Sequence, residues 1–395
     1  MFEMVDEKGQ KALIKVVGVG GCGGNAVDFM IEKNVRGVEF ICINTDLQAL
    51  KKSQANTIIQ IGDSLTKGLG AGSRPDTGKQ AAIDDKEKIV QAIQGADMLF
   101  ITAGMGGGTG TGATPIIAQT AKELGILTVA VVTKPFDFEG RRTQIAKEGI
   151  SELVNYVDSL IVIPNEKLMG VLGDEVTFVD AFGAANNVLN SAVEGIAEII
   201  NNPGLINVDF SDVKTVMSEM GVAVIGSGFS EGPDRAISAA KEAVSCPLLE
   251  EVNLNNAKGI LVNISASKDF KMREYFEVMD HIKKYAAENA SIIVGSVIDE
   301  SLNNHLRVTM VATGLSVPAN AYEPSKTGDI EPNVLDSTNV IEEINFSTEG
   351  GDGLNVFEEN HGEGVGISSL EDDSEYDTPS FLRSRNKEND FSKND

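Results

Sequence analysis

The chain has no tryptophan, three cysteines and three histidines, and it has no apolar run long enough to span a bilayer. Cys22, Cys42 and Cys246 show neither metal-ligand nor disulfide spacing, which favours a reducing compartment such as the cytoplasm. The N-terminal sequence MFEMVDEKGQ is too polar for a signal peptide. We therefore expect neither a secreted, disulfide-stabilised protein nor one that inserts into a membrane.

Basic residues are also scarce. The chain has 33 Lys and Arg and 59 Asp and Glu, which gives a net charge of −26. The sequence before the acidic C-terminal part contains no cluster of Lys and Arg that would form a basic face, so we expect no nucleic-acid partner. The last 75 residues hold 19 acidic and 5 basic side chains. Apolar periodicity ends near residue 316, which predicts a disordered acidic linker over 316–373.

The length of 395 residues favours two globular domains. Apolar runs alternating with helical patterns predict a parallel α/β domain over 1–175. Its expected buried strands are 13–20, 38–45, 97–103, 127–133 and 158–164. An apolar seam from Phe178 to Ile199 predicts a long connecting helix within 176–203. A smaller α+β domain should follow over 204–315. Its expected strands are 221–228, 259–266, 291–298 and 305–314, and its expected helices are 234–244 and 270–288.

A first glycine cluster, VGVGGCGGNAV, lies between a strand and a helix at 17–27. Gly18, Gly20 and Gly23 satisfy G-x-G-x-x-G, which favours a dinucleotide-binding turn with Asp46 as a candidate ribose ligand. The pattern alone is weak, and a tight turn without a ligand is an alternative. A dinucleotide-dependent oxidoreductase is therefore one candidate function.

A second cluster, AGMGGGTGTGATP at 103–115, also joins a strand to a helix. Its backbone N–H groups and threonine hydroxyls are suited to an anion. Two such loops favour a nucleoside triphosphate over a dinucleotide, although a glycine run can also be a flexible linker. No Walker A motif is present, because SRPDTGKQ lacks the first glycine and has Gln80 where Ser or Thr should stand.

The motif GGGTGTG at 106–112 resembles the signature of the tubulin/FtsZ superfamily of GTPases, and the chain from Met1 to about Gly314 resembles its FtsZ family. Further matching stretches are VGVGGCGGNAV, INTDLQAL, TKGLGAG, TKPFDFEGRR and GLINVDFSDVKTVMSEMG. The resemblance implies a GTPase that binds GTP with Mg²⁺. It also implies head-to-tail polymers that form the bacterial division ring, in the cytoplasm at midcell on the inner face of the membrane.

The resemblance also implies a set of nucleotide-binding residues. They are Gly20, Gly21, Cys22, Gly23, Gly24, Asn25, Gly104, Gly106, Gly107, Gly108, Thr109, Gly110, Glu139, Arg142, Asn165, Phe182 and Asn186. The glycine loops would hold phosphates and Glu139 the ribose, with Arg142 near the γ-phosphate. Asn165 and Asn186 would contact the sugar and base, and Phe182 would stack on guanine. Without the resemblance, Phe182 equally fits core packing and Arg142 a solvated helix start.

Two departures from the family pattern stand in these stretches. Cys22 stands where the family commonly has glycine or alanine, and we expect its alkylation to slow nucleotide exchange. The stretch after Glu139 is one residue shorter than usual, which leaves open whether Arg141 or Arg142 takes the phosphate role.

No general base is evident near the glycine loops, and His281, His305 and His361 have no catalytic neighbour in the sequence. The candidates are Asn207, Asp209 and Asp212 in NVDFSDV. Their sequence also fits a simple helix start, with Asp209 as N-cap, Asp212 in a capping box, and a staple between Val208 and Val213. The long helix would carry this loop about 35 Å from the helix start, at ~1.5 Å per residue.

The resemblance implies that the loop enters the nucleotide site of the next subunit, where its carboxylates position the attacking water. Such a head-to-tail contact generates open filaments. A non-catalytic protein that holds GTP only structurally is the remaining alternative.

The C-terminal segment 374–395 contains SEYDTPSFLRSR. It resembles the terminal peptide of the family, which binds membrane-tethering and regulatory division proteins. The implied contact residues are Asp377, Pro379, Phe381, Leu382 and Arg383. A random disordered end is the alternative that composition alone supports.

Overall fold

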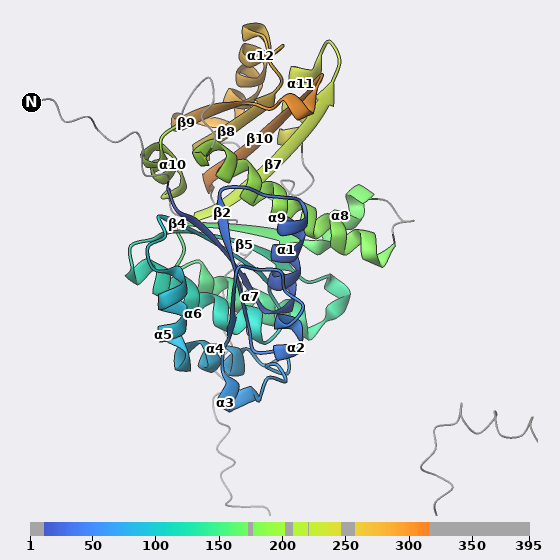
Figure 1. The fold of residues 1–395 in the computed structure, drawn as a ribbon. Coiled ribbons are helices and arrows are strands. Elements are labelled where there is room, and N and C mark those ends of the chain that lie inside the picture. The colour runs from blue at the N-terminus through green and yellow to red at the C-terminus, as the bar shows by residue number, and fades with distance from the viewer. Residues whose placement is uncertain (1–11, 173–176, 202–207, 220, 246–256, 316–395) are drawn as a thin grey trace, which may run out of the picture. The chain divides into compact units, whose positions relative to one another are not determined.

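The structure of the chain is a computed structural model that describes residues 12–172, 177–201, 208–219, 221–245 and 257–315 (Figure 1). All of these residues fall within one compact unit, Met1–Asp329. The predicted linker 316–373 and the terminal peptide 374–395 lie outside the described residues. The domain boundaries at 175 and 203 stay a prediction.

A single mixed sheet runs through the described residues in the order β3-β2-β1-β4-β5-β6-β7-β10-β8-β9. The strands are β1 (Ile14–Val19), β2 (Val38–Asn44), β3 (Thr57–Gln60), β4 (Met98–Gly104), β5 (Leu127–Lys134), β6 (Ser159–Pro164), β7 (Gly221–Glu231), β8 (Ala257–Ala266), β9 (Ala286–Ile298) and β10 (His305–Leu315). Neighbours from β3 to β7 are parallel, whereas β10 is antiparallel to both β7 and β8. The predicted fold class, a parallel α/β part followed by a long helix and a smaller α+β part, is confirmed.

Helices cover both faces of the parallel part of the sheet, which explains why its strands read as continuous apolar runs. The helices of this half are α1 (Gly20–Glu32), α2 (Leu47–Leu50), α3 (Asp63–Thr66), α4 (Pro75–Asp84), α5 (Lys86–Ile93), α6 (Thr109–Glu123), α7 (Arg141–Leu153) and α8 (Asn165–Leu172). Ile14 and Val16 of β1 pack in a core with α1 and α9, while Val17 and Val19 pack in a second core with α4, α5, α6 and α7.

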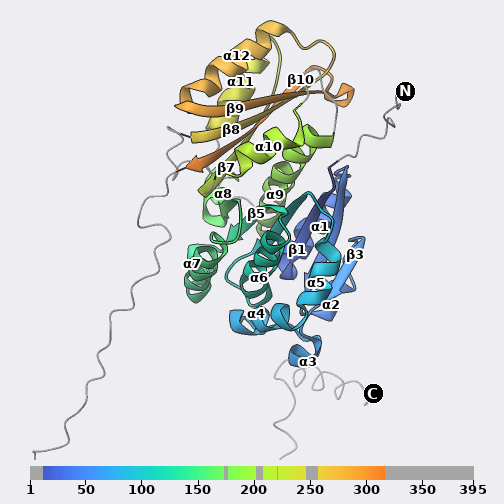
Figure 2. The same cartoon turned by 90° about the vertical axis from the view of Figure 1, so that its left-hand side faces the viewer.

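The second half is built around a long helix, α9 (Phe178–Asn201), whose predicted apolar seam is buried from Ala185 to Ile199. Its other helices are α10 (Phe210–Met217), α11 (Arg235–Val244) and α12 (Met272–Ile282). Helices α9 and α10 share a core with Leu261 and Val311, whereas α11 and α12 form a separate core with the opposite face of β8 and β10 (Figure 2). In the described ranges, no helix combines the length and apolar character that a bilayer span requires.

Two details differ from the sequence-based expectation. Strand β3 is missing from the expected strands, because Thr57 and Ile58 are exposed and its four residues give no apolar run. The helix expected over 270–288 ends at Ile282, and Ala286 already pairs with Ala257 in the sheet. Ala and Glu favour a helix there, but pairing with β8 overrides this weak local preference.

Candidate functional site

The two glycine clusters lie side by side at the carboxyl ends of two neighbouring strands. Strand β1 pairs with β4 up to Val19 and Ala103, and α1 begins directly after β1. Gly20 has a φ of +72°, and a Cβ at this position would lie 2.9 Å from the backbone N of Gly110. Only glycine therefore allows the two loops to touch at this point.

The helices that follow these loops begin without side-chain caps. Neither α1 nor α6 has a capping hydrogen bond or an acidic residue in its first turn. In contrast, Asp46 caps α2 by accepting hydrogen bonds from the N–H groups of Gln48 and Ala49 at 2.7 and 3.3 Å. The unpaired N–H groups and the dipoles of α1 and α6 make the space before them suitable for an anion.

A cavity of about 350 Å³ opens before these two helices. Of the predicted nucleotide-binding residues, it is lined by Gly21, Cys22, Gly104, Gly107, Gly108, Thr109, Gly110, Glu139, Arg142, Asn165, Phe182 and Asn186. The predicted residues outside the lining are Gly20, Gly23, Gly24, Asn25 and Gly106. Several of these glycines shape the loops instead, since a Cβ at Gly23 would lie 2.3 Å from the carbonyl oxygen of Thr102.

Asp46, which the first glycine pattern suggested as a ribose ligand, also lines the cavity. The lining residues that were not predicted are Val19, Asn44, Ala49, Gly70, Ala71, Ser73, Met105, Thr133, Pro135 and Ala185. Thr45 Oγ1 lies 2.7 Å from Thr109 Oγ1, which ties the end of β2 to the start of α6. Gly70 and Gly72 in TKGLGAG have positive φ, so the closely spaced glycines of that stretch were the available signal for this wall.

One end of the cavity is aromatic and amide-rich. Phe182 is 40% exposed, and its ring meets that of Phe136 edge to face with centroids 5.9 Å apart. Asn186 lies one turn further along the same side of α9. Asn165 is 7% exposed, and its Oδ1 has no hydrogen-bond partner. A buried amide oxygen without a partner beside a cavity indicates a ligand that supplies the missing donor.

The carboxylates that line the cavity are both engaged. Asp46 caps α2, and Glu139 accepts hydrogen bonds from the N–H of Phe136 and from the Arg142 guanidinium. Arg142 also lies over the second glycine loop, with its Nε 3.4 Å from the carbonyl oxygen of Gly106. Arg141 begins α7 and is not among the lining residues, so Arg142 is the arginine of the pair that reaches the cavity.

The remaining candidate carboxylates lie on α10. Asp209 is its N-cap and accepts a hydrogen bond from the N–H of Asp212 at 2.8 Å, as the capping pattern predicted. Both side chains are exposed, and neither lines the cavity. Asn207, the third catalytic candidate, lies outside the described residues.

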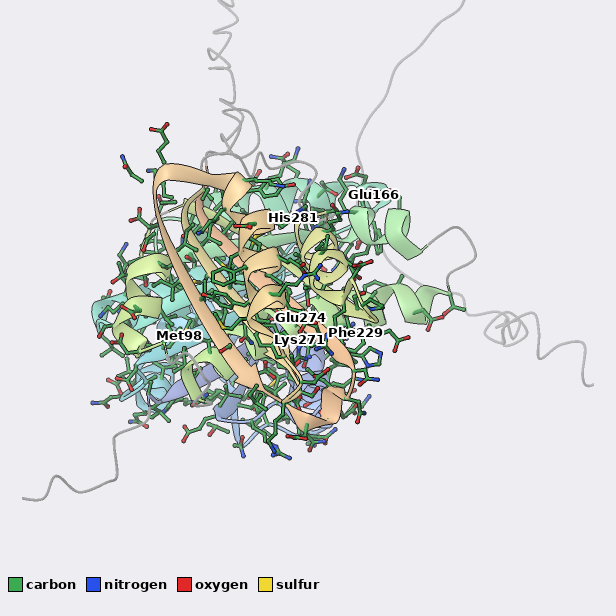
Figure 3. All side chains as sticks on the ribbon, turned by 90° about the horizontal axis from the view of Figure 1, so that it is seen from above. Met98, Glu166, Phe229, Lys271, Glu274 and His281 are labelled. Carbon is green, nitrogen blue, oxygen red and sulfur yellow. The ribbon has the colours of Figure 1, made fainter. Side chains whose placement is uncertain are left out.

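The described histidines lie away from the cavity. His281, labelled in Figure 3, belongs to α12. Burial, followed by the charges of Lys284 and Lys241, lowers its pKa. His305 stacks on Phe229 and pairs with Glu231. Within the described ranges, no cluster of three or more His, Cys, Asp or Glu could hold a metal ion.

Comparisons with known proteins agree with this arrangement. Residues 13–173 match the family model described as the GTPase domain of the Tubulin/FtsZ family, and residues 221–316 match the C-terminal domain of the FtsZ family. The cell division protein FtsZ of Pseudomonas aeruginosa is 52% identical over 392 residues, which cover 97% of this chain and 99% of that protein.

Two solved structures share the fold. An empty FtsZ dimer from M. jannaschii is 44% identical with a TM-score of 0.74, and the match covers 78% of this chain and 90% of that one. A GTPγS-bound protofilament of CetZ2 from Haloferax volcanii is 19% identical with a TM-score of 0.67, covering 77% and 93%, and supports the fold alone.

Fold and site together define a GTPase of the tubulin/FtsZ class, with its two glycine loops at the ends of parallel strands. Within that class, the chain belongs to the FtsZ family of cell division GTPases. The family assignment supports a GTPase rather than the dinucleotide-dependent oxidoreductase or the non-catalytic GTP-holding protein.

Proposed function

We propose that the cavity binds GTP and that the nucleotide is hydrolysed between head-to-tail subunits of a filament. The phosphates would lie before α1 and α6, where uncapped N–H groups are available. Guanine would stack on Phe182, and Asn165 and Asn186 would contact the sugar and base. The unpartnered Oδ1 of Asn165 gives the most direct support for a ligand at this end.

Mg²⁺ fits this cavity as a cation held mainly by the nucleotide. Oxygen-bearing side chains of Asn44, Asp46 and Thr109 line the wall, and hard cations prefer such ligands together with phosphates and water. When bound, the ion would neutralise charge on the β- and γ-phosphates. The residues of the chain would orient the nucleotide, and Arg142 would lie beside its terminal phosphate.

The main support for assembly-dependent hydrolysis is that the carboxylates lining the cavity are already hydrogen-bonded, whereas a carboxylate elsewhere on the chain is exposed. Asp46 and Glu139 are both held by hydrogen bonds within the cavity wall, whereas Asp212 is exposed on α10 beyond the far end of α9. We propose that Asn207, Asp209 and Asp212 of one subunit position the attacking water in the cavity of the next. Such a heterologous contact repeats into an open filament.

The test is GTP turnover per subunit, measured against protein concentration with sedimentation in parallel. A site completed between subunits requires a threshold concentration below which both turnover and pelleting vanish. A rate per subunit that stays constant through dilution would indicate a self-contained site and overturn the proposal.

We further propose that the filament forms the division ring in the cytoplasm, at midcell on the inner face of the membrane. Residues 374–395 would recruit membrane-tethering and regulatory division proteins through Asp377, Pro379, Phe381, Leu382 and Arg383. The acidic linker 316–373 would join this peptide to domains 1–175 and 204–315, connected by the helix 176–203. Deleting 374–395 should spare pelleting and abolish membrane recruitment; undiminished recruitment of the truncated chain would refute the role of the peptide.

A further inference from the structure

Among the cysteines that the structure describes, Cys22 lines the cavity, in the first turn of α1. Its Sγ lies 3.7 Å from the hydroxyl of Thr133 at the end of β5. A Cβ at Gly104 would come within 2.6 Å of the Cβ and 2.9 Å of the Sγ of Cys22. The thiol therefore occupies a slot between the two glycine loops that exists only because residue 104 is glycine.

We propose that Cys22 is a modification site, and that a group attached to its thiol and the phosphates of a bound nucleotide exclude one another. The inference rests on the proposed nucleotide site. The cavity that Cys22 lines also contains the buried Oδ1 of Asn165, which is 7% exposed and has no hydrogen-bond partner, and this supports a ligand in the same cavity. An adduct on Cys22 would occupy space before the N-terminus of α1, which is where the phosphates would lie.

Exclusion works in both directions. Nucleotide that covers the first turn of α1 protects the thiol, and a modified thiol weakens nucleotide binding; for a reversible adduct such as a mixed disulfide, the two equilibrium effects are equal by thermodynamic linkage. The structure offers an internal comparison, because Cys42 is 2% exposed in the core below Gly24 and does not line the cavity. Cys246 lies outside the described residues and must be monitored separately.

The chemistry requires the Cys22 thiolate. With a low-molecular-weight disulfide such as glutathione disulfide, the thiolate attacks one sulfur, a new S–S bond forms, the old one breaks, and the second sulfur leaves as a thiolate. Burial raises the pKa of the Cys22 thiol, against smaller opposing effects from Thr133 and Arg142. Because burial raises this pKa, the rate of the reaction should keep rising with pH beyond the usual thiol pKa of 9.0.

The experiment uses the full-length protein stripped of nucleotide, with iodoacetamide as the probe. Mass spectrometry follows the alkylation of each cysteine, and a fluorescent GDP analogue reports binding. GDP at about 100 times its Kd should slow the alkylation of Cys22 about 100-fold, since only the unoccupied site reacts. Complete alkylation of Cys22 should in turn abolish GDP binding at concentrations that saturate the untreated protein, which is a stronger effect than the slowed exchange expected from the sequence alone.

Variants assign the effect to one thiol. The ratio of GDP affinity before and after iodoacetamide should equal one in Cys22→Ala and, as a second variant in case alanine impairs folding, in Cys22→Ser. Cys42→Ala should behave as the parent chain. Unchanged GDP binding after complete alkylation of Cys22, or equal alkylation rates with and without bound GDP, would overturn the inference. A lack of GDP binding by the untreated protein would instead overturn the proposed nucleotide site, and the inference with it.

Discussion

The N-termini of α1 and α6 differ from those of α2 and α10 in how their N–H groups are satisfied. Helices α2 and α10 begin with Asp46 and Asp209, each of which accepts hydrogen bonds from the first turn. Helices α1 and α6 begin in glycine loops with no capping side chain. A helix start without a cap is less stable by about 0.5–2 kcal/mol. Helices α3, α4, α5, α7 and α11 also begin without a capping side chain, so a missing cap alone does not identify a ligand site. At α1 and α6 the missing caps coincide with the two glycine loops and with the cavity, where a phosphate would supply the acceptors.

The largest expected effect is a loss of GTP turnover on substitution of Asp212 in the capped helix α10. Asp209 is occupied as a cap, whereas Asp212 donates only its backbone N–H to that cap and keeps its carboxylate exposed. Asp212→Ala should therefore retain GTP binding and lose turnover by about 10²–10⁴-fold, as expected when a group that assists proton transfer or positions water is removed. Phosphate release at a concentration well above the assembly threshold measures it.

Two controls accompany this variant. Pelleting of Asp212→Ala with GTP separates a loss of chemistry from a loss of assembly. Asp212→Asn keeps the size of the side chain and should be equally inactive if the charge matters. Full turnover by the alanine variant would refute the catalytic role of Asp212.

A carboxylate placed before the uncapped helix α6 tests whether the free helix start contributes to GTP affinity. Gly107 precedes α6, and a Cβ there meets only the Nη2 of Arg142, at 4.0 Å. Gly107→Asp should weaken GTP binding by up to about 30-fold, or ~2 kcal/mol, because the new charge competes with phosphate for the same dipole and guanidinium. Isothermal titration with GTP gives the affinity.

Gly107→Asn is the matched control, because it has nearly the same shape without the charge. It should lose far less affinity than the aspartate variant. Equal losses in the two variants would mean that crowding, rather than charge at the helix start, determines binding.

A smaller effect, on folding stability, should distinguish a glycine that the backbone conformation requires, Gly20, from one that it does not require, Gly21. Gly20→Ala forces a residue with a Cβ into positive φ and against the second loop, which should cost about 1–2 kcal/mol of folding free energy. A Cβ at Gly21 would meet nothing within 4 Å, so Gly21→Ala should leave folding stability unchanged or slightly raised. Urea unfolding of both variants tests the contrast, and equal destabilisation would contradict it.

The smallest expected effect concerns the cap of α10. Asp209→Ala should lower stability by about 1 kcal/mol, because the N–H of Asp212 loses its acceptor. Asp209→Asn should restore most of that loss, since asparagine caps nearly as well. Chemical denaturation distinguishes them; an asparagine variant no more stable than the alanine variant would show that the cap contributes little here.

Much of the fold can be predicted from the sequence because burial on both faces leaves continuous apolar runs, as in β1, β4 and β5, and a regular seam along α9. The same signal is missing from β3, which is half exposed, and misleading at Ala286, where sheet pairing overrides helix preference. In the site, the glycine loops are evident because their composition is unusual. The wall formed by Asn44, Gly70 and Ser73 is less evident, because the glycines of TKGLGAG mark a tight turn but only tertiary contact shows that this turn lines the cavity.

Helix α9 has a consequence beyond packing. Phe182 and Asn186 near its first turns line the cavity, and α10 follows its other end. The 24 residues of α9 span about 36 Å at ~1.5 Å per residue. In a filament built as proposed, the length of this helix sets the distance between the nucleotide bound by a subunit and the carboxylates that the same subunit contributes to the site of its neighbour. An insertion of four residues, about 6 Å of helix, would misalign the two halves of every active site while leaving each half intact.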